Sequence, residues 1–260
     1  MKLIYITFLL FFGLIHSQEI DSSRIECKYF TKFLIDTTDI STSKEEMTSL
    51  LIGDRISLFK SDAKATFDSL SRNNVAESMR KGGNIVIDFS NIPKAYFIQE
   101  VLYKKNKATI YDKILKNVFA FESQNKINWK LIDETKTISN YICKKAVGKY
   151  GKRIVTAWYT QEIPFQEGPY NFKGLPGLIV EAYDDKNFYH FILKSLKKIN
   201  KPIIPIKDCI ETDYTKFSKK RHDFKEDPIG AFNVATGRTV TKDQQARIIK
   251  LHQSKNNYLE

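Results

Sequence analysis

Alternating apolar and polar residues run through most of the chain and predict a strand-rich protein. Residues 24–35 mix β-branched and aromatic residues with polar ones, a composition typical of a strand. Residues 50–59 predict two short strands that turn at Gly53-Asp54. Residues 85–89 then alternate with a period of two, which indicates a further strand.

The middle and later parts of the chain continue this pattern. Further strands are predicted at 96–103, 108–111, 113–121, 137–147, 153–160, 178–183 and 188–194. Turn residues separate them, among them Lys105-Asn106 and the stretch 148–152. Because strand follows strand with short connections, we expect an antiparallel sheet rather than alternating strands and helices.

A helix is predicted between the early strands. Ser61 is a suitable N-cap, and Ala63, Phe67 and Leu70 follow at helical spacing. The helix is expected to end before Gly82-Gly83, because glycine favours termination.

A second helix is predicted near the end of the sequence. Residues 241–244 match a capping box, so Thr241 is expected to begin a helix with Ala246, Ile249 and Leu251 on its buried side. Residues 208–228 are polar and poorly periodic and predict no regular element. The expected fold class is mainly β to α+β: a curved antiparallel sheet, a meander or half-barrel, with one internal and one C-terminal helix against it.

Residues 1–17, MKLIYITFLLFFGLIHS, have the pattern of a secretory signal peptide, with Lys2 before an apolar run and a small residue before Gln18. The run is shorter than the ~20 residues that cross a bilayer, so an uncleaved anchor is the weaker alternative. We expect a mature chain that starts at Gln18, forms a single domain over 18–260 and has no transmembrane span. Its location would be periplasmic or extracellular.

The chain is basic, with a formal net charge of +12. Such a charge suits an anionic partner such as lipid headgroups, a polysaccharide or nucleic acid. The lysines are scattered, however, and the sequence contains neither an RNP-type aromatic run nor zinc-finger spacing. Nucleic acid is therefore not an expected partner.

The three cysteines, Cys27, Cys143 and Cys209, lie far apart in the sequence. One disulfide with one free thiol and no disulfide at all are both open, and any of the three pairings could form the bridge. The histidines do not form an H-E-x-x-H motif, and neither they nor the cysteines cluster. We expect no metal site and no cofactor.

The most distinctive stretch is the loop 161–177, which interrupts the strand pattern with prolines, glycines and aromatic residues. The candidate site residues in and beside it are Trp158, Tyr159, Pro164, Pro169, Tyr170, Phe172, Gly174, Leu175, Pro176, Gly177 and Leu178. Pro176 and Gly177 suit the second and third positions of a type II turn. Two interpretations stay open: a loop packed by its own aromatic residues, or a loop that contacts a ligand.

Several segments in this region carry a family resemblance. They are Trp129-Lys130-Leu131, residues 138–146, 156–160 and 163–164, and the run GPYNFKGLPGLI at 168–179. With them the chain resembles the GLPGLI family of exported proteins, found chiefly in Bacteroidota. One departure is Gly151-Lys152-Arg153, which interrupts the Gly-Arg turn expected of the family and leaves the length of that hairpin open.

The resemblance implies export to the envelope of a Gram-negative bacterium and a shared domain, but it supplies no catalytic residues. The chain also resembles, more distantly, the bowl-like N-terminal domain of type II peptide-N-glycosidase F enzymes, and this resemblance does not extend to their activity. Family members are thought to be encoded near outer-membrane transporters, which makes such a transporter one candidate partner.

The leading hypothesis is a non-enzymatic binding or accessory module whose partner is an envelope protein, a glycan or a lipid. The alternative is an envelope hydrolase whose carboxylates converge only in three dimensions, and a cleft with two such carboxylates would favour it. A third class is an adhesion or structural subunit. Cys143 is expected to pack in a strand, and the acidic pairs Asp133-Glu134 and Asp184-Asp185 are expected to be solvated.

Overall fold

A computed structural model describes residues 21–81 and 93–260. The strands are β1 Ser22–Leu34, β2 Ser43–Ile52, β3 Ile56–Ser61, β4 Glu100–Lys104, β5 Lys107–Ile114, β6 Asn117–Glu122, β7 Lys130–Ile138, β8 Tyr141–Tyr150, β9 Arg153–Thr160, β10 Leu178–Asp184, β11 Tyr189–Pro202 and β12 Ile210–Glu211. The helices are α1 Asp62–Lys81, α2 Tyr214–Glu226, α3 Pro228–Thr236 and α4 Lys242–Gln253, with a 3-10 turn at Ile40–Thr42.

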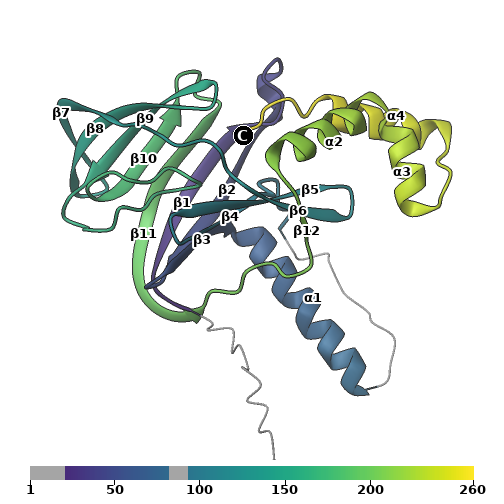
Figure 1. Cartoon of the computed structure of the whole chain (residues 1–260), viewed down its shortest axis with the longest axis horizontal. Coiled ribbons are helices and arrows are strands. Elements are labelled where there is room, and N and C mark those ends of the chain that lie inside the picture. Colours follow the sequence, from purple (N-terminus) through teal and green to yellow (C-terminus); the bar gives the residue numbers. More distant parts are fainter. Residues whose placement is uncertain (1–20, 82–92) are drawn as a thin grey trace, which may run out of the picture.

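All the strands in this part of the chain belong to one open sheet of twelve strands (Figure 1). Their order is β12-β6-β5-β4-β3-β2-β1-β11-β10-β9-β8-β7, and every pair is antiparallel except the short parallel pair β12–β6. The sheet thus consists of two meanders, β1–β6 and β7–β11, joined by the pair β1–β11. The expected curved antiparallel sheet is confirmed, and the sheet does not close into a barrel.

The core lies mainly on one face of the sheet, where buried residues of both meanders form one cluster. A smaller apolar cluster lies elsewhere, and it combines residues of β2 to β6 with Ile203. The larger cluster is rich in aromatic rings, and Phe97 is within edge-to-face distance of Phe33, Phe59 and Phe191. Edge-to-face pairs add to the stabilisation from apolar burial and fix how the rings interlock.

The predicted turns in the first meander are confirmed. β2 and β3 are connected through Gly53-Asp54, although β2 begins at Ser43, earlier than the pattern indicated. β4 and β5 turn at Lys105-Asn106, where both residues have positive φ, 51° and 61°. Two successive positive φ values are those of a type I′ hairpin turn, whose twist matches that of the strands.

Two predicted strands are interrupted by turns. Residues 137–147 contain the end of β7, a turn at Ser139-Asn140 with φ of 48° and 70°, and the start of β8. Residues 113–121 likewise contain a turn, with Leu115 at φ 54°. Neither turn contains glycine or proline, so the alternation of apolar and polar residues gave no sign that the strand was interrupted.

The hairpin between β8 and β9 also differs from the prediction. β8 continues through Gly148 to Tyr150, and the turn is confined to Gly151-Lys152. Gly151 has φ of +57°, a conformation that glycine adopts without steric cost.

Helix α1 begins as predicted, since the Lys64 backbone N–H donates to Ser61 Oγ at 3.2 Å. Of the residues at helical spacing, Ala63 is buried, whereas Phe67 and Leu70 are 42% and 39% exposed. Figure 1 shows the reason, because α1 extends away from the sheet beyond its first turns. The expected end at Gly82-Gly83 and the strand at 85–89 lie outside the described residues.

The later part of the chain contains three helices rather than one. Helix α2 falls within residues 208–228, for which the sequence predicted no regular element, and its buried residues are Phe217 and Phe224. Asp213 caps α2 and Asp227 caps α3, and these caps were the available sequence signal. The polar exposed face of α2 concealed its helical spacing.

The capping box of α4 is confirmed, with Thr241 and Gln244 bonded reciprocally. Ala246 is exposed and Ile249 is only half-buried, so these two residues do not form the expected buried face, and the side chain of Leu251 lies outside the described residues. α4 packs against α3, and His252 contacts Phe224 of α2 at 4.6 Å between ring centres. Among the helices described, none has the length and hydropathy needed to cross a bilayer.

Candidate functional site

The motif loop, residues 161–177, lies against the core face of the sheet. Tyr170, Phe172 and Leu175 are at most 1% exposed. Tyr170 contacts the rings of Tyr150 and Phe97, and Phe172 contacts Tyr150 edge-to-face. This burial is what the packed-loop interpretation requires.

The remaining predicted site residues divide between buried and exposed positions. Trp158, Tyr159, Pro169, Gly177 and Leu178 are buried. Pro164, Gly174 and Pro176 are exposed, so they form the accessible edge of the loop. The structure therefore does not gather the predicted residues into one accessible site.

The turn at Pro176 is tighter than expected. Gly177 N–H donates to Leu175 O at 2.8 Å, which is the bond of a three-residue turn, and Leu178 N–H donates to Ile163 O at 3.0 Å. Gly177 has the positive φ that the motif required, at 151°. The loop is also tied to the start of β10, because Ile179 N–H donates to Glu167 O at 2.9 Å, and Tyr29 Oη of β1 donates to Ile179 O at 2.7 Å.

A buried ion pair that sequence reasoning missed fastens this loop to the sheet. Lys173 contacts Glu167, and its ammonium donates to Ser57 Oγ of β3 at 2.9 Å. Ser57 in turn donates to Glu167 Oε2 at 3.1 Å. Burial lowers the pKa of Lys173 to about 7.

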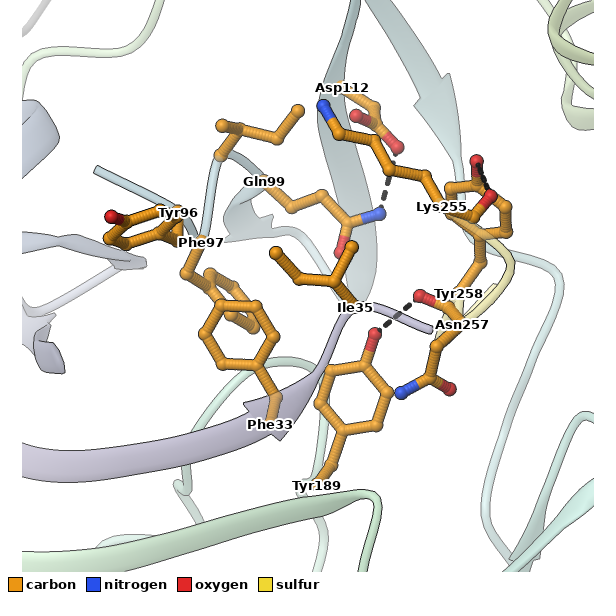
Figure 2. A pocket seen from close by; sticks show the side chains of 11 residues that line it. Phe33, Ile35, Tyr96, Phe97, Gln99, Asp112, Tyr189, Lys255, Asn257 and Tyr258 are labelled. Carbon is orange, nitrogen blue, oxygen red and sulfur yellow. Dashed lines mark hydrogen bonds between the residues drawn. The ribbon is translucent and has the colours of Figure 1, made fainter. Parts of the chain in front are cut away.

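A pocket at one end of the core face is the better candidate for a ligand site (Figure 2). Its lining comprises Phe33, Ile35, Tyr96, Phe97, Ile98, Gln99, Asp112, Tyr189, Lys255, Asn257 and Tyr258. It has a volume of about 80 Å³. Residues from β1, β5, β11 and two loops meet here, so only the folded sheet assembles it. We refer to it as the Asp112 pocket.

The Asp112 pocket has aromatic and polar parts. Figure 2 shows the rings of Phe33 and Phe97 on one side and Gln99 with Asp112 on another. Gln99 Nε2 donates to Asp112 Oδ2 at 2.8 Å. Burial raises the pKa of the Asp112 carboxyl and lowers that of the Lys255 ammonium. Both groups are thus shifted toward their neutral forms.

Arg221 of α2 adds a second cation behind Asp112. Its Nη1 is 3.7 Å from Asp112 Oδ2, an ion pair without a hydrogen bond. The guanidinium lies over the Tyr258 ring, 3.8 Å from the ring centre. A buried guanidinium N–H without an acceptor is unusual, so this end of the pocket retains unused hydrogen-bonding capacity.

A larger groove of about 670 Å³ lies between α1 and the sheet. The carboxylates that line it are Glu26, Asp62, Asp68 and Glu100. Lysines pair with all of them, including Lys28 with Asp62 at 2.7 Å. Lys28 Nζ also donates to Ser49 Oγ at 2.7 Å, and Ser49 contacts Asp62. A cleft with two converging carboxylates was the feature expected from the sequence to favour a hydrolase.

The three cysteines are free thiols in this structure, and the alternatives with a disulfide stay predictions from the sequence. Cys27 and Cys143 are fully buried, and burial raises their pKa to about 12 and about 11. Neither is therefore a thiolate near neutral pH. Within residues 21–81 and 93–260, no group of three or more His, Cys, Asp or Glu side chains could hold a metal ion.

One expectation about the acidic pairs was wrong. Asp184 is only 3% exposed, because it contacts Arg153 and accepts from the Tyr189 backbone N–H at 2.9 Å. Asp133 and Glu134 are exposed on β7, as expected.

Comparison with known proteins draws attention to the motif loop. The model of a family described as "Protein of unknown function (Porph_ging)" matches residues 149–181. The matched residues overlap those that resemble the GLPGLI family, and that family name stays a prediction from the sequence. No curated protein matches the chain.

Solved structures similar to this chain include PNGF-II in the P21 and C2 space groups. They are 14% and 15% identical, with a TM-score of 0.48 in both cases. The alignments cover 76% of this chain and 32% of the other, so this chain spans about a third of the length of PNGF-II. An uncharacterized conserved protein from Thermus thermophilus is 8% identical, with a TM-score of 0.36 over 72% of this chain and 90% of that one.

The two motif glycines allow a direct test of the turn. A Cβ at Gly177 would lie 2.0 Å from Thr160 O, whereas a Cβ at Gly174 would meet nothing within 4 Å. We expect Gly177→Ala to lower the free energy of unfolding by about 3–4 kcal/mol. Gly174→Ala, with φ of +88°, should lower it by about 1–2 kcal/mol. Urea unfolding followed by tryptophan fluorescence measures both, and equal losses would contradict the turn geometry.

The buried Asp112 predicts a pH dependence of stability. Because its folded pKa is raised above 3.8, the folded state binds the proton more tightly than the unfolded chain. This contribution is present at acid pH and is lost as pH rises through the folded pKa. We expect Asp112→Asn to flatten the fall in unfolding free energy as pH rises above about 4. The exposed Asp185→Asn is the control, and a wild-type slope in Asp112→Asn would refute the assignment.

Proposed function

We propose that this protein is a non-enzymatic binding or accessory module of the cell envelope, and that the Asp112 pocket receives part of its ligand. The observation that carries the proposal is the composition of the pocket. Its lining combines aromatic rings with one carboxyl group, one ammonium and two amides. Apolar walls with a few polar groups are typical of binding sites. Hydrolysis of a glycoside by the usual mechanism requires two carboxyl groups, and this lining supplies one.

The size of the pocket limits the ligand. A cavity that accommodates benzene measures roughly 150 Å³, about twice the volume of this one. A lipid acyl chain or an intact sugar ring therefore does not fit inside, whereas an amino-acid side chain or a sugar substituent does. Of the three partner classes, this favours a protein, with a glycan as the second choice.

The proposed location is the periplasm or the cell exterior, and the support is the signal-like sequence of residues 1–17 together with the resemblance to exported proteins. An outer-membrane transporter is one partner consistent with that location. Intact-mass analysis of the protein from envelope fractions should give a mature chain that starts at Gln18. A retained N-terminal segment would remove the support for export.

The pocket can be tested by substitution at its rim. Tyr96 lines the pocket and is half-buried, so Tyr96→Ala should weaken ligand capture without unfolding the protein. We expect crosslinking in native envelopes, followed by recovery of the protein, to yield at least about fivefold less attached partner than for wild type.

Phe30→Ala is the matched control. Like Tyr96, Phe30 is a half-buried aromatic residue with a lysine over its ring, but it does not line the pocket. Two results would count against the Asp112 pocket. One is specific partner capture by Tyr96→Ala at the wild-type level, and the other is an equal reduction of capture by Phe30→Ala.

A hydrolase is the second candidate function, and the Lys28–Ser49–Asp62 cluster in the larger groove supports it. In an esterase reaction, Asp62 would accept the Ser49 proton as Ser49 Oγ attacks the acyl carbon, and the ester C–O bond would break as the alcohol leaves with that proton. Water would then hydrolyse the acyl-Ser49 ester, which releases the acid and restores the hydroxyl. With p-nitrophenyl esters as probes, this function predicts a loss on the order of 10³-fold in Ser49→Ala. Ser69→Ala, in the same groove, is the control. Activity that survives Ser49→Ala would exclude the cluster.

A further inference from the structure

Residues 255–260, the tail segment, have no regular secondary structure, and Leu259 packs into the core cluster of the sheet. We refer to the surface that this segment covers as the groove. The backbone N–H groups of Asn256 and Asn257 both donate to Ile35 O, at 3.2 and 3.3 Å, just beyond the end of β1. Its side chains make hydrogen bonds to several separate elements, among them β1, β8 and β9. It thus lies on the sheet in the manner of an extended peptide ligand rather than as a further strand.

The first subsite of the groove holds a carboxamide. Asn257 Nδ2 donates to Leu34 O at 2.7 Å, and Asn257 Oδ1 accepts from the Arg153 guanidinium. Tyr189 Oη donates to Asn257 O at 2.8 Å. Asp184 holds Arg153 in place through its own ion pair. Both the N–H donor and the carbonyl oxygen of the Asn257 amide therefore bond to groups that the fold holds in place.

The second subsite is apolar and the third holds a carboxyl group. Leu259 is only 2% exposed and belongs to the aromatic core cluster. Glu260 follows, and its carboxyl contacts Tyr150 Oη and accepts from Tyr170 Oη at 3.2 Å. Asn125 Nδ2 donates to the other carboxyl oxygen at 3.0 Å.

This carboxyl subsite binds Glu260 without a cation within salt-bridge distance in the described residues. Burial is the largest influence on Glu260 and raises its pKa, although the hydroxyl and amide donors oppose the shift. The Ser123 hydroxyl, 3.1 Å from both oxygens, completes the donor set. Near neutral pH, desolvation of the carboxylate therefore opposes docking of the tail segment. The internal occupant is held less tightly than its contacts alone suggest.

We propose that this groove is a binding site for an extended peptide of a partner protein, with the tail segment as the occupant when no partner is present. The matching peptide carries a carboxamide residue, an apolar residue two positions later and a carboxylate directly after it. The inference rests on the proposed binding function and names the chemistry of the partner. The groove borders the Asp112 pocket, because Lys255, Asn257 and Tyr258 of the bound tail segment line that pocket.

The test uses the full chain and a synthetic peptide of residues 255–260, amidated at its end and labelled with a fluorophore at its start. Asn257→Ala/Glu260→Ala weakens the internal occupant and leaves every groove residue intact. Because the internal segment competes with the peptide, the double variant should bind it at least about tenfold more tightly than wild type, by fluorescence anisotropy.

Two controls establish which contacts matter. A peptide with alanine at the positions of Asn257 and Glu260 should not bind, and Lys250→Ala, an exposed change in α4, should behave as wild type. Adding Tyr150→Phe to the double variant removes a donor to the carboxylate and should weaken peptide binding about tenfold or more. Equal binding of both peptides would overturn the proposal.

Absence of binding to a double variant that retains its strand signal in circular dichroism would also overturn it. So would a dimer by light scattering, because the groove would then take the segment of a second copy. Hydrogen exchange of the wild-type protein needs no substitution. The amides of residues 256–260 should exchange through local opening, and exchange only through global unfolding would mark the segment as a permanent part of the core.

These outcomes are independent of the capture experiment with Tyr96→Ala. Failure of the peptide to bind, with pocket-dependent capture retained, rejects the peptide groove alone. Binding of the peptide without any envelope partner rejects the envelope role alone.

Discussion

The antiparallel pairing of β1 with β11 is the interaction on which the rest of the structure depends. Within each meander, neighbouring strands are connected by short links, by the motif loop or by the segment that contains α1. β1 and β11, in contrast, are far apart in the sequence, and among the described residues they form the only strand pair that joins the two meanders. The entropy needed to bring them together is offset by burial, because Cys27 and Tyr29 of β1 are inaccessible to solvent. Register shifts on both sides of residues 25–28 increase the local bend. The curved face that results is the surface against which the motif loop and the tail segment pack.

Polar contacts attach these irregular segments to the curved face. Lys173 and Glu167 fasten the motif loop to β3, Arg153 and Asp184 position Asn257, and Arg221 lies behind Asp112. Buried charges contribute little net stability, since desolvation opposes their attraction, but a lost partner is costly. They therefore select one arrangement of the segments over others of similar apolar burial. A face lined with such groups can distinguish one polar peptide from another.

Much of the fold was predictable because its causes are local. The turn at Lys105-Asn106, the cap at Ser61 and the capping box at Thr241 each depend on residues a few positions apart. The failures have the opposite origin. The turn at Ser139-Asn140 lies inside continuous alternation. Helix α2 is held by the packing of Phe217 on Phe119 and Phe121 of β6, which a mostly polar sequence does not reveal.

The candidate site shows the same contrast between features with local causes and features with long-range causes. The aromatic, proline and glycine residues of 161–177 marked an ordered loop, and the positive φ of Gly177 follows from its residue type and motif. Whether Tyr170 faces a ligand or the core depends on which way the sheet curves, and that is settled by the β1–β11 pairing. Asp112, Tyr189 and Asn257 are neighbours for the same reason, because contacts between residues so distant in sequence arise from strand register and curvature. Local side-chain chemistry therefore determined where the strands and helices form, and only the tertiary structure determined which of them lie together.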